Sequence, residues 1–399
     1  MNFQTIDDKK QCIGVYANGT LHYDNFPKDL TGTWKYSAAI PNTDIVEHAS
    51  LYCEGRTLEQ VCPMELQDDL KAVSKKLNAY LKSFKIAKLN MREHCIFDLV
   101  PEDFLKQYCE IKNQITEHVL NNYDAPSNYK FLCDVEKLLY KIRYQELNLN
   151  NEGCRELHLL SRNRQKTKEL LENYRYIDYN LFGTVTGRLT TNPGSFPILT
   201  VRKDFRKLLK PQNDWLLSLD YNGAEIRTFL ALSDLEQPSE DIHEWNMKNI
   251  YHDSAETNTR EEAKVRFFAW LYDDSSDDHS AATYYNKEKL IDNYYDGQRV
   301  TTPMHRHIKV EKRKALNYLI QSVTSDLVLD RAVALDQFLE GRKSFISHVV
   351  HDEVVIDLHE DDKEIVPKIK EIFAKNKLAC YTVNLNAGKN YLDLKELKL

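Results

Sequence analysis

The sequence lacks any hydrophobic run that approaches the length of a membrane span. Its first residues, MNFQTIDDKKQ, also lack the apolar core of a signal peptide. We therefore expect no association with a membrane and a cytoplasmic location.

Pairs of the CxxC type are absent too, although the chain contains eight cysteines, at positions 12, 53, 62, 95, 109, 133, 154 and 380. Zinc ribbons and disulfide frameworks use regularly spaced cysteines, so neither kind of site is indicated. We expect all eight to be reduced thiols.

An excess of positive charge is also absent. The formal net charge is −7, from 54 Lys and Arg residues and 61 Asp and Glu residues, which argues against indiscriminate coating of nucleic acid. Two basic segments exist nevertheless, at 202–210 and 299–314. Each segment alone is explained best as a solvated surface, but a nucleic-acid enzyme could gather such residues on one face.

The composition that remains is that of a globular protein. The chain has 399 residues, of which 42% are hydrophobic, enough for two or three domains. Residues 1–65 are expected to be β-rich, with a hairpin in which Asn18-Gly19 joins 13–17 to 20–23. No strand carries the paired acids that a metal-dependent exonuclease needs, and Asp134-Val135-Glu136 falls in a helical pattern at the expected surface.

From Glu65 to about Asn150 the sequence shows helical periodicity, most clearly in two sets of apolar residues: Leu66, Leu70, Val73, Leu77 and Leu81, and then Phe131, Val135, Leu138, Leu139 and Ile142. This pattern predicts long amphipathic helices packed as hairpins, with Pro126 between two of them. Such a subdomain could frame a ligand, and a purely structural role would give the same pattern.

The stretch Asn213–Arg227, NDWLLSLDYNGAEIR, is the most informative part of the chain. Residues 215–219 predict a short buried strand that ends at Asp220, and a turn at Asn222-Gly223 leads into a helix. A carboxylate at such a strand end can bind a metal ion beside a ligand. Strand-end acids are common, however, so for Asp220 alone a structural role is favoured.

Four side chains farther along recur every fourth residue: Arg260, Lys264, Phe268 and Tyr272. On a helix this spacing places them on one slightly drifting stripe. Two cations followed by two aromatic rings are unusual for a core face or for a solvated face. They suit a ligand with phosphates at one end and a flat base at the other.

Three other segments carry polar residues in suggestive places. The turn Thr186-Gly187-Arg188-Leu189 could bring its arginine to a base edge or a phosphate. Residues 311–340 predict a helix, and its stripe of Arg313, Asn317 and Gln321 could contact a nucleic-acid groove. Two β-rich runs, 345–350 and 354–358, predict a hairpin with His351-Asp352-Glu353 at its turn.

Together these segments resemble the polymerase domain of family A DNA polymerases, the bacterial polymerase I and T-odd-phage replicative type. Asp220–Arg227 resembles the first palm motif, with a metal-binding aspartate and, five residues on, a glutamate. The 260–272 stripe resembles the fingers helix that binds the incoming nucleotide, and Asp241-Ile242-His243 resembles the segment before it. His351-Asp352-Glu353 resembles the second palm motif, and the two remaining segments resemble elements that contact the primer–template minor groove.

The resemblance covers residues 175–399 and implies an α+β fold of the right-hand type, with an antiparallel-sheet palm, helical fingers and a helical thumb. The expected domains are a thumb-like helical region (66–174), the first part of the palm (175–232), the fingers (233–302) and the second part of the palm (303–399). The β-rich N-terminal region (1–65) has no counterpart in the resemblance, and its role is unknown.

The implied activity is template-directed DNA synthesis, in which a primer 3′-hydroxyl attacks the α-phosphate of a deoxynucleoside triphosphate. The implied cofactor is a pair of Mg²⁺ ions bound by Asp220, Asp352 and the carbonyl of Tyr221. The implied catalytic residues are Asp220, Asp352 and Lys264, with Glu353 as an auxiliary acid. The implied nucleotide-binding residues are Tyr221, Glu225, His243, Arg260, Lys264, Phe268 and Tyr272, and the DNA-binding residues are Arg188, Arg313, Asn317, Gln321 and His351.

The sequence departs from the family pattern in two places. Gly223 stands where glutamine is common, and Asp273 stands where a glycine usually follows the fingers tyrosine. The stretch between Tyr272 and Asn317 is short for the family, which predicts reduced fingers. The compact size and the reduced fingers predict a phage enzyme of the host cytoplasm. The lack of exonuclease motifs predicts that it has no 3′–5′ exonuclease of its own. The expected partners are primer–template DNA, dNTP and a separate exonuclease or processivity protein.

Three alternatives stay open. An RNA polymerase is disfavoured by Glu225, because single-subunit RNA polymerases have a small residue there. A reverse transcriptase is disfavoured by the 260–272 stripe. A catalytically silent DNA-binding relative would be expected to have lost Asp220, Asp352 or Lys264, and all three are present.

Overall fold

The structure is a computed structural model that describes residues 1–9, 12–40, 45–91, 93–252, 257–273, 276 and 278–398. The chain forms two compact units, Met1–Tyr140 and Lys141–Leu399. Among the described residues, no helix has both the length and the apolar character needed to cross a membrane.

The first unit begins with three antiparallel strands in the order β1 (Phe3–Lys9), β2 (Cys12–Ala17) and β3 (Thr20–His22). Asn18 and Gly19 join β2 to β3 with φ angles of 47° and 76°. Both angles are left-handed, as a tight turn between two strands requires, so the predicted hairpin is confirmed. Two short parallel strands, β4 (Gly32–Thr33) and β5 (Glu47–His48), follow.

Helices make up most of the rest of the first unit. They are α1 (Ala49–Tyr52), α2 (Leu58–Val61), α3 (Gln67–Ile86), α4 (Ile96–Leu99), α5 (Glu102–Asn122) and all but the last three residues of α6 (Tyr129–Arg143), with a 3₁₀ turn at Met64–Leu66. The long helices α3 and α5 pack against each other around buried residues such as Leu70, Val73 and Ile115. Pro126 lies between α5 and α6, as the apolar periodicity predicts.

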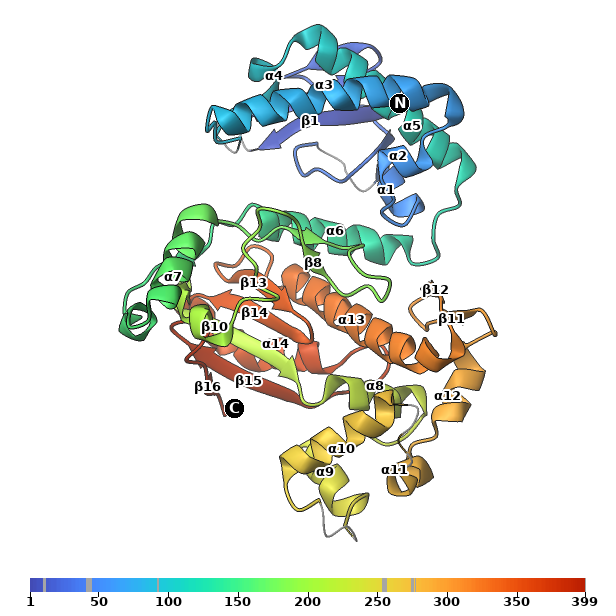
Figure 1. The fold of residues 1–399 in the computed structure, drawn as a ribbon, viewed down its shortest axis with the longest axis vertical. Coiled ribbons are helices and arrows are strands. Elements are labelled where there is room, and N and C mark those ends of the chain that lie inside the picture. The colour runs from blue at the N-terminus through green and yellow to red at the C-terminus, as the bar shows by residue number, and fades with distance from the viewer. Residues whose placement is uncertain are drawn as a thin grey trace. The chain divides into compact units, whose positions relative to one another are not determined.

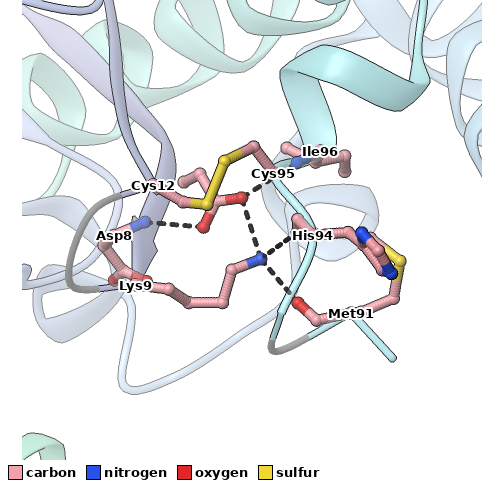
Figure 2. The surroundings of a disulfide bond; sticks show 8 residues. Asp8, Lys9, Cys12, Met91, His94, Cys95 and Ile96 are labelled. Carbon is pink, nitrogen blue, oxygen red and sulfur yellow. Dashed lines mark hydrogen bonds and ion pairs between the residues drawn. A yellow bond between two sulfur atoms is a disulfide. The ribbon is translucent and has the colours of Figure 1, made fainter. Parts of the chain in front are cut away.

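A disulfide between Cys12 and Cys95 contradicts the expectation that every cysteine is a free thiol (Figure 2). It joins the start of β2 to the residue before α4, 83 residues farther along the chain. Lys9 supports the same junction, because its Nζ donates to the carbonyls of Met91 and His94 at 2.6 and 2.8 Å. Cysteine spacing could not reveal this pair, since tertiary folding alone brings the two segments together. The other six cysteines are free thiols.

The second unit is built on a five-stranded sheet in the order β13-β14-β10-β15-β16, with every neighbouring pair antiparallel (Figure 1). The strands are β10 (Trp215–Tyr221), β13 (Phe345–Val350), β14 (Glu353–Leu358), β15 (Val383–Gly388) and β16 (Lys395–Glu396). Leu216, Leu217 and Leu219 of the central strand are completely buried. A continuous apolar run suits a strand covered on both faces, which is why this run predicts β10 correctly.

Helices α13 (Lys312–Phe338) and α14 (Val366–Ala374) pack against each other and against the sheet, and α8 (Ala224–Leu232) packs on α13. A 3₁₀ helix at Glu360–Ile365 leads into α14. The predicted helix 311–340 and hairpin 345–358 are therefore confirmed to within about two residues.

The described part of residues 233–310 contains four helices, α9 (Ile242–Asn249), α10 (Arg260–Tyr272), α11 (His279–Tyr284) and α12 (Lys287–Tyr294), and then a hairpin of β11 (Arg299–Thr301) and β12 (His307–Lys309). The sequence predicts only α10 among these elements. The others are short, and each has too few apolar residues to show a clear period.

The segment before β10 is less regular. It contains α7 (Ser161–Asn173), two 3₁₀ helices (Arg155–His158 and Lys203–Leu208) and two small antiparallel pairs, β6 (Asn148–Leu149) with β9 (Leu209–Lys210) and β7 (Tyr179–Asn180) with β8 (Thr190–Thr191). The fold is therefore a mixture of helix and sheet, as predicted. The finer division into thumb, palm and fingers stays a prediction.

Candidate active site

Two carboxylates meet at one end of the five-stranded sheet. Asp220 lies near the end of β10, opposite Glu353 of β14 and Asn384 of β15. Asn384 donates a hydrogen bond from Nδ2 to the Asp220 carboxylate at 3.3 Å. Asp352 occupies the turn between β13 and β14, directly before Glu353, and the preceding His351 has a left-handed φ of 55°. The sheet register therefore brings together acids that are more than 130 residues apart in sequence.

Burial and neighbouring charges shift the pKa values of these acids. Burial, followed by the carboxylates of Asp352 and Glu353, raises the pKa of Asp220 from 3.8 to about 7. Burial also raises the pKa of Asp352, whereas the charges of His351, Arg188 and Lys264 lower it. Lys264 lowers the pKa of Asp220 as well. Its ammonium group therefore acts on both carboxylates from helix α10.

Glu353 is fixed by two hydroxyl groups. Ser218 donates to one carboxylate oxygen, and Tyr391 donates to the other at 2.6 Å. Burial raises the pKa of Glu353, and these two hydrogen bonds lower it. Tyr391 is a partner that the sequence does not predict, because it lies in an irregular segment 38 residues away. Both oxygens of Glu353 are thus already engaged within the protein.

The described residues contain no group of three or more His, Cys, Asp or Glu side chains arranged to hold a metal ion. Asp220 and Asp352 nevertheless have the donor chemistry that suits a hard cation, because both are carboxylates. Their burial and mutual repulsion disfavour the ionised forms, and a bound cation would relieve both effects. Asp220 and Asp352 therefore have the chemistry expected of ligands to Mg²⁺.

Glu225, in the first turn of α8, is held between two predicted site residues. Arg188 donates from Nη2 to one carboxylate oxygen at 2.6 Å, and the hydroxyl of Tyr272 donates to the other. Gln321 of α13 also forms a hydrogen bond with Tyr272. Residues from two distant segments, Arg188 and Tyr272, thus bind Glu225, and Gln321 supports Tyr272. Arg188, predicted as a DNA ligand, is ion-paired in this structure.

The N-terminus of α9 forms a second polar junction. Asp241 caps this helix by accepting from the amides of His243 and Glu244. Its other oxygen accepts from Asn222 at 2.6 Å and from Arg260 Nη2 at 2.9 Å. Asp241 therefore connects the turn after β10 to the first residue of α10.

The α10 stripe is present as predicted, and its members have different partners. Arg260 is paired with Asp241, while Lys264 has no ion-pair partner anywhere in the described chain. The rings of Phe268 and Tyr272 are stacked, with centroids 5.9 Å apart. A half-buried lysine between a fixed arginine and two rings leaves one positive charge available to a ligand.

His243 lies beside this stripe, with its ring 6.0 Å from that of Phe268. Burial, followed by the charge of Arg260, lowers the pKa of His243 to about 4. Its Nδ1 is buried and has no hydrogen-bond partner. A neutral imidazole with a spare ring nitrogen can exchange a hydrogen bond with a bound group.

Gly223 explains one departure from the family pattern. Its φ of 66° is left-handed, and a Cβ at this position would lie 2.3 Å from Cγ2 of Ile242. Only glycine meets both conditions without strain. The turn that follows β10 can therefore pack closely against the start of α9.

Arg227 is a functional candidate that the sequence does not reveal. It is completely buried, and it donates to the carbonyls of Asn222, Pro238 and Glu240 at 2.6–2.8 Å. An arginine within an otherwise apolar helical pattern is the one signal that could have indicated it. Arg227 fixes the loop between α8 and α9, and thereby the position of Asp241.

The predicted DNA-binding stripe on α13 is not a single network. Arg313 is exposed and paired with Glu311, whereas Asn317 has a buried Oδ1 without a hydrogen-bond partner. Gln321 contacts Tyr272, as described above. The three side chains lie along successive turns of one helix, as their spacing predicts.

Comparison with known proteins shows the fold of this chain but not its family. No protein-family model matches it, and no curated protein sequence matches it. Among solved structures, it is similar to the POL domain of Pol1 from M. smegmatis, a complex with DNA primer-template and dNTP. The TM-score is 0.62 at 12% sequence identity, and the match covers 86% of this chain and 82% of that chain. This chain therefore has a fold similar to that of a polymerase domain.

Proposed function

We propose that the chain is a template-directed DNA polymerase that adds deoxynucleotides to a primer 3′ end. The observation that carries this proposal is the meeting of Asp220 and Asp352 at one end of the sheet, with the positive charge of Lys264 acting on both. Phosphoryl transfer depends on charge neutralisation and positioning, and these three side chains supply both. The fold similarity supports the same activity.

Asp220 and Asp352, together with the carbonyl of Tyr221, would hold two Mg²⁺ ions. When bound, the ions would lower the pKa of the primer hydroxyl and stabilise the leaving oxygens. Lys264 would neutralise the triphosphate and supply a proton to the leaving pyrophosphate. Glu353, fixed by Ser218 and Tyr391, would keep the strand end rigid beside Asp220.

The other site residues would bind and orient the nucleotide. Arg260, held in place by Asp241, and His243, with its free ring nitrogen, would contact the outer phosphates. Phe268 and Tyr272 would pack on the nascent base pair. Movement of α10 would close the site around a correct nucleotide, as binding steps of this class commonly do.

Glu225 would select the sugar. Its carboxylate is held at both oxygens, so a ribose 2′-hydroxyl pressed against it would meet a fixed side chain. We therefore expect a strong preference for deoxynucleotides. Glu225→Ala should incorporate ribonucleotides better than the parent, and an unchanged preference would remove this assignment.

The remaining assignments follow from the polymerase proposal. The five-stranded sheet would be the palm, residues 233–302 the fingers and 66–174 the thumb. Arg188, Arg313, Asn317, Gln321 and His351 would contact the primer–template. The chain would lack a 3′–5′ exonuclease and work with a separate exonuclease or processivity protein, as expected of a phage enzyme.

Primer extension tests the proposal directly. A labelled primer–template with Mg²⁺ should be extended with deoxynucleotides and not with ribonucleotides. Asp352→Asn removes one charge with little change of shape, and it should lower the extension rate by at least about 100-fold. A mutant with the parent rate would contradict the proposed metal site.

The silent-relative alternative makes a different prediction in the same experiment. A parent chain that binds the duplex in a gel-shift assay but never extends it would favour that alternative. Supplying an RNA template or ribonucleotides in parallel distinguishes a reverse transcriptase or an RNA polymerase.

A further inference from the structure

A buried ion pair in the second unit lies outside the residues assigned above. Arg306 donates from Nε to both oxygens of Asp326, at 2.9 and 2.8 Å, and from Nη2 to one of them at 2.8 Å. The Asp326 side chain is completely buried, and that of Arg306 is only 12% exposed. Burying two charges costs desolvation free energy, which their attraction offsets only when the hydrogen-bond geometry is good. A gain in stability alone therefore does not explain this pair.

The guanidinium of Arg306 supports the backbone of the predicted DNA-binding turn. Gly187 has a left-handed φ of 76°, and a Cβ at this position would lie 2.5 Å from Cζ of Arg306. Ser325, the neighbour of Asp326 on α13, donates from Oγ to the Gly187 carbonyl at 3.0 Å. The turn therefore rests on a charged group that cannot move away, because Asp326 holds it.

The next residue along the turn reaches the proposed sugar-selecting side chain. Thr184 fixes the backbone of Arg188 by donating to its carbonyl at 2.9 Å. Arg188 then donates to Glu225 at 2.6 Å. A continuous series of contacts thus runs from Asp326 through Arg306, the turn and Arg188 to Glu225.

We propose that Arg306 is a positioning residue for sugar selection. Its guanidinium fixes the position of the 184–188 turn and thereby the position of Arg188 against Glu225. The inference rests on the proposed function, in which Glu225 excludes the 2′-hydroxyl. The planar fork of arginine suits this task, since it bonds Asp326 in its plane while its face stays against Gly187. A lysine would keep the charge but lose that shape.

The measurement is the ratio of kcat/KM for a deoxynucleotide to kcat/KM for the matching ribonucleotide in single-nucleotide primer extension. A smaller folded fraction lowers both values equally and leaves the ratio unchanged, whereas a displaced Glu225 lowers the ratio. We expect Arg306→Met and Arg306→Lys to lower the ratio roughly 5- to 10-fold, in the same direction as Glu225→Ala.

Gly187→Ala attacks the same contact from the turn and leaves the ion pair in place. We expect it to lower the ratio as well, which keeps the inference testable if Arg306→Met does not fold. The matched control is Arg331→Met, which removes an ion pair with Asp330 elsewhere on α13. That variant should lose stability while keeping the parent ratio.

The possible outcomes separate the two proposals. A parent that extends no primer removes the proposed function. A ratio unchanged by Glu225→Ala removes the sugar assignment and this inference with it. If Glu225→Ala lowers the ratio but Arg306→Lys and Gly187→Ala do not, the polymerase proposal survives and the positioning role of Arg306 is overturned.

Discussion

At the scale of single residues, spacing in the sequence predicts which side chains share a face but not what they contact. The α10 stripe and the strand-end position of Asp220 follow from local period. The pairing of Arg188 with Glu225, and of Arg260 with Asp241, does not, because these partners come from segments that only tertiary folding brings together.

Gly223 gives a prediction at this scale. Gly223→Ala should destabilise the protein by about 2–4 kcal/mol, since it combines a left-handed backbone with an overlap against Ile242. The matched control is Gly194→Ala, whose φ of 84° is also left-handed but whose Cβ would meet no atom within 4 Å. It should cost only about 1–2 kcal/mol. Equal losses of unfolding free energy in urea would show that the contact with Ile242 carries no cost.

At the scale of elements, long periodic segments were predictable and short ones were not. The sequence identifies β10, α10, α13 and the β13–β14 hairpin, whereas α9, α11, α12 and the β11–β12 hairpin are missed. The helices among these missed elements are stabilised by N-capping residues such as Asp241 and Asn286 and by tertiary packing. The spacing of apolar residues gives no information on either. The Cys12–Cys95 disulfide, which the cysteine pattern argues against, belongs to the same class of tertiary contact.

That disulfide supports a prediction for the first unit. A cross-link across 83 residues restricts the unfolded chain, so its loss should cost about 2–4 kcal/mol. Thermal unfolding of the full chain with and without a reductant should show the shift in the transition of the first unit. In the double variant Cys12→Ser, Cys95→Ser the reductant should have no further effect. If the reductant left the melting temperature of the parent protein unchanged, the disulfide would have no stabilising role.

At the scale of the whole molecule, buried histidines make the second unit sensitive to acid. Burial, followed by the charge of Arg206, lowers the pKa of His348 from 6.5 to about 3. The pKa of His243 is lowered from 6.5 to about 4. As pH falls below 6.5, these histidines become protonated in the unfolded chain before they do so in the folded chain. The free energy of unfolding therefore decreases as the pH falls from 6.5 toward 4. Each histidine should cost on the order of 1–2 kcal/mol between pH 7 and 5.

The check is urea unfolding of the full chain at pH 7 and pH 5. His348→Leu should reduce the difference between the two pH values, whereas His279→Gln, at an exposed position, should leave it unchanged. A pH dependence identical in the parent and in His348→Leu would exclude a contribution from this histidine.

The proposed lack of a proofreading exonuclease can be tested at the same scale. We expect a mismatched, labelled primer to remain intact when the purified protein is incubated with Mg²⁺ and no nucleotide. Shortening of the primer that persists in Asp352→Asn would reveal a separate nuclease site and contradict the expectation.

The antiparallel register of β10 has a consequence for how this protein can vary. Because side chains alternate between the two faces of a strand, inserting one residue between Trp215 and Asp220 would turn Asp220 to the opposite face and bring Leu219 to the place of the acid. Deleting one residue would bring Tyr221 there instead. Natural variants should therefore tolerate length changes in the turns and connections around the sheet. The number of residues between the start of β10 and Asp220 should stay constant.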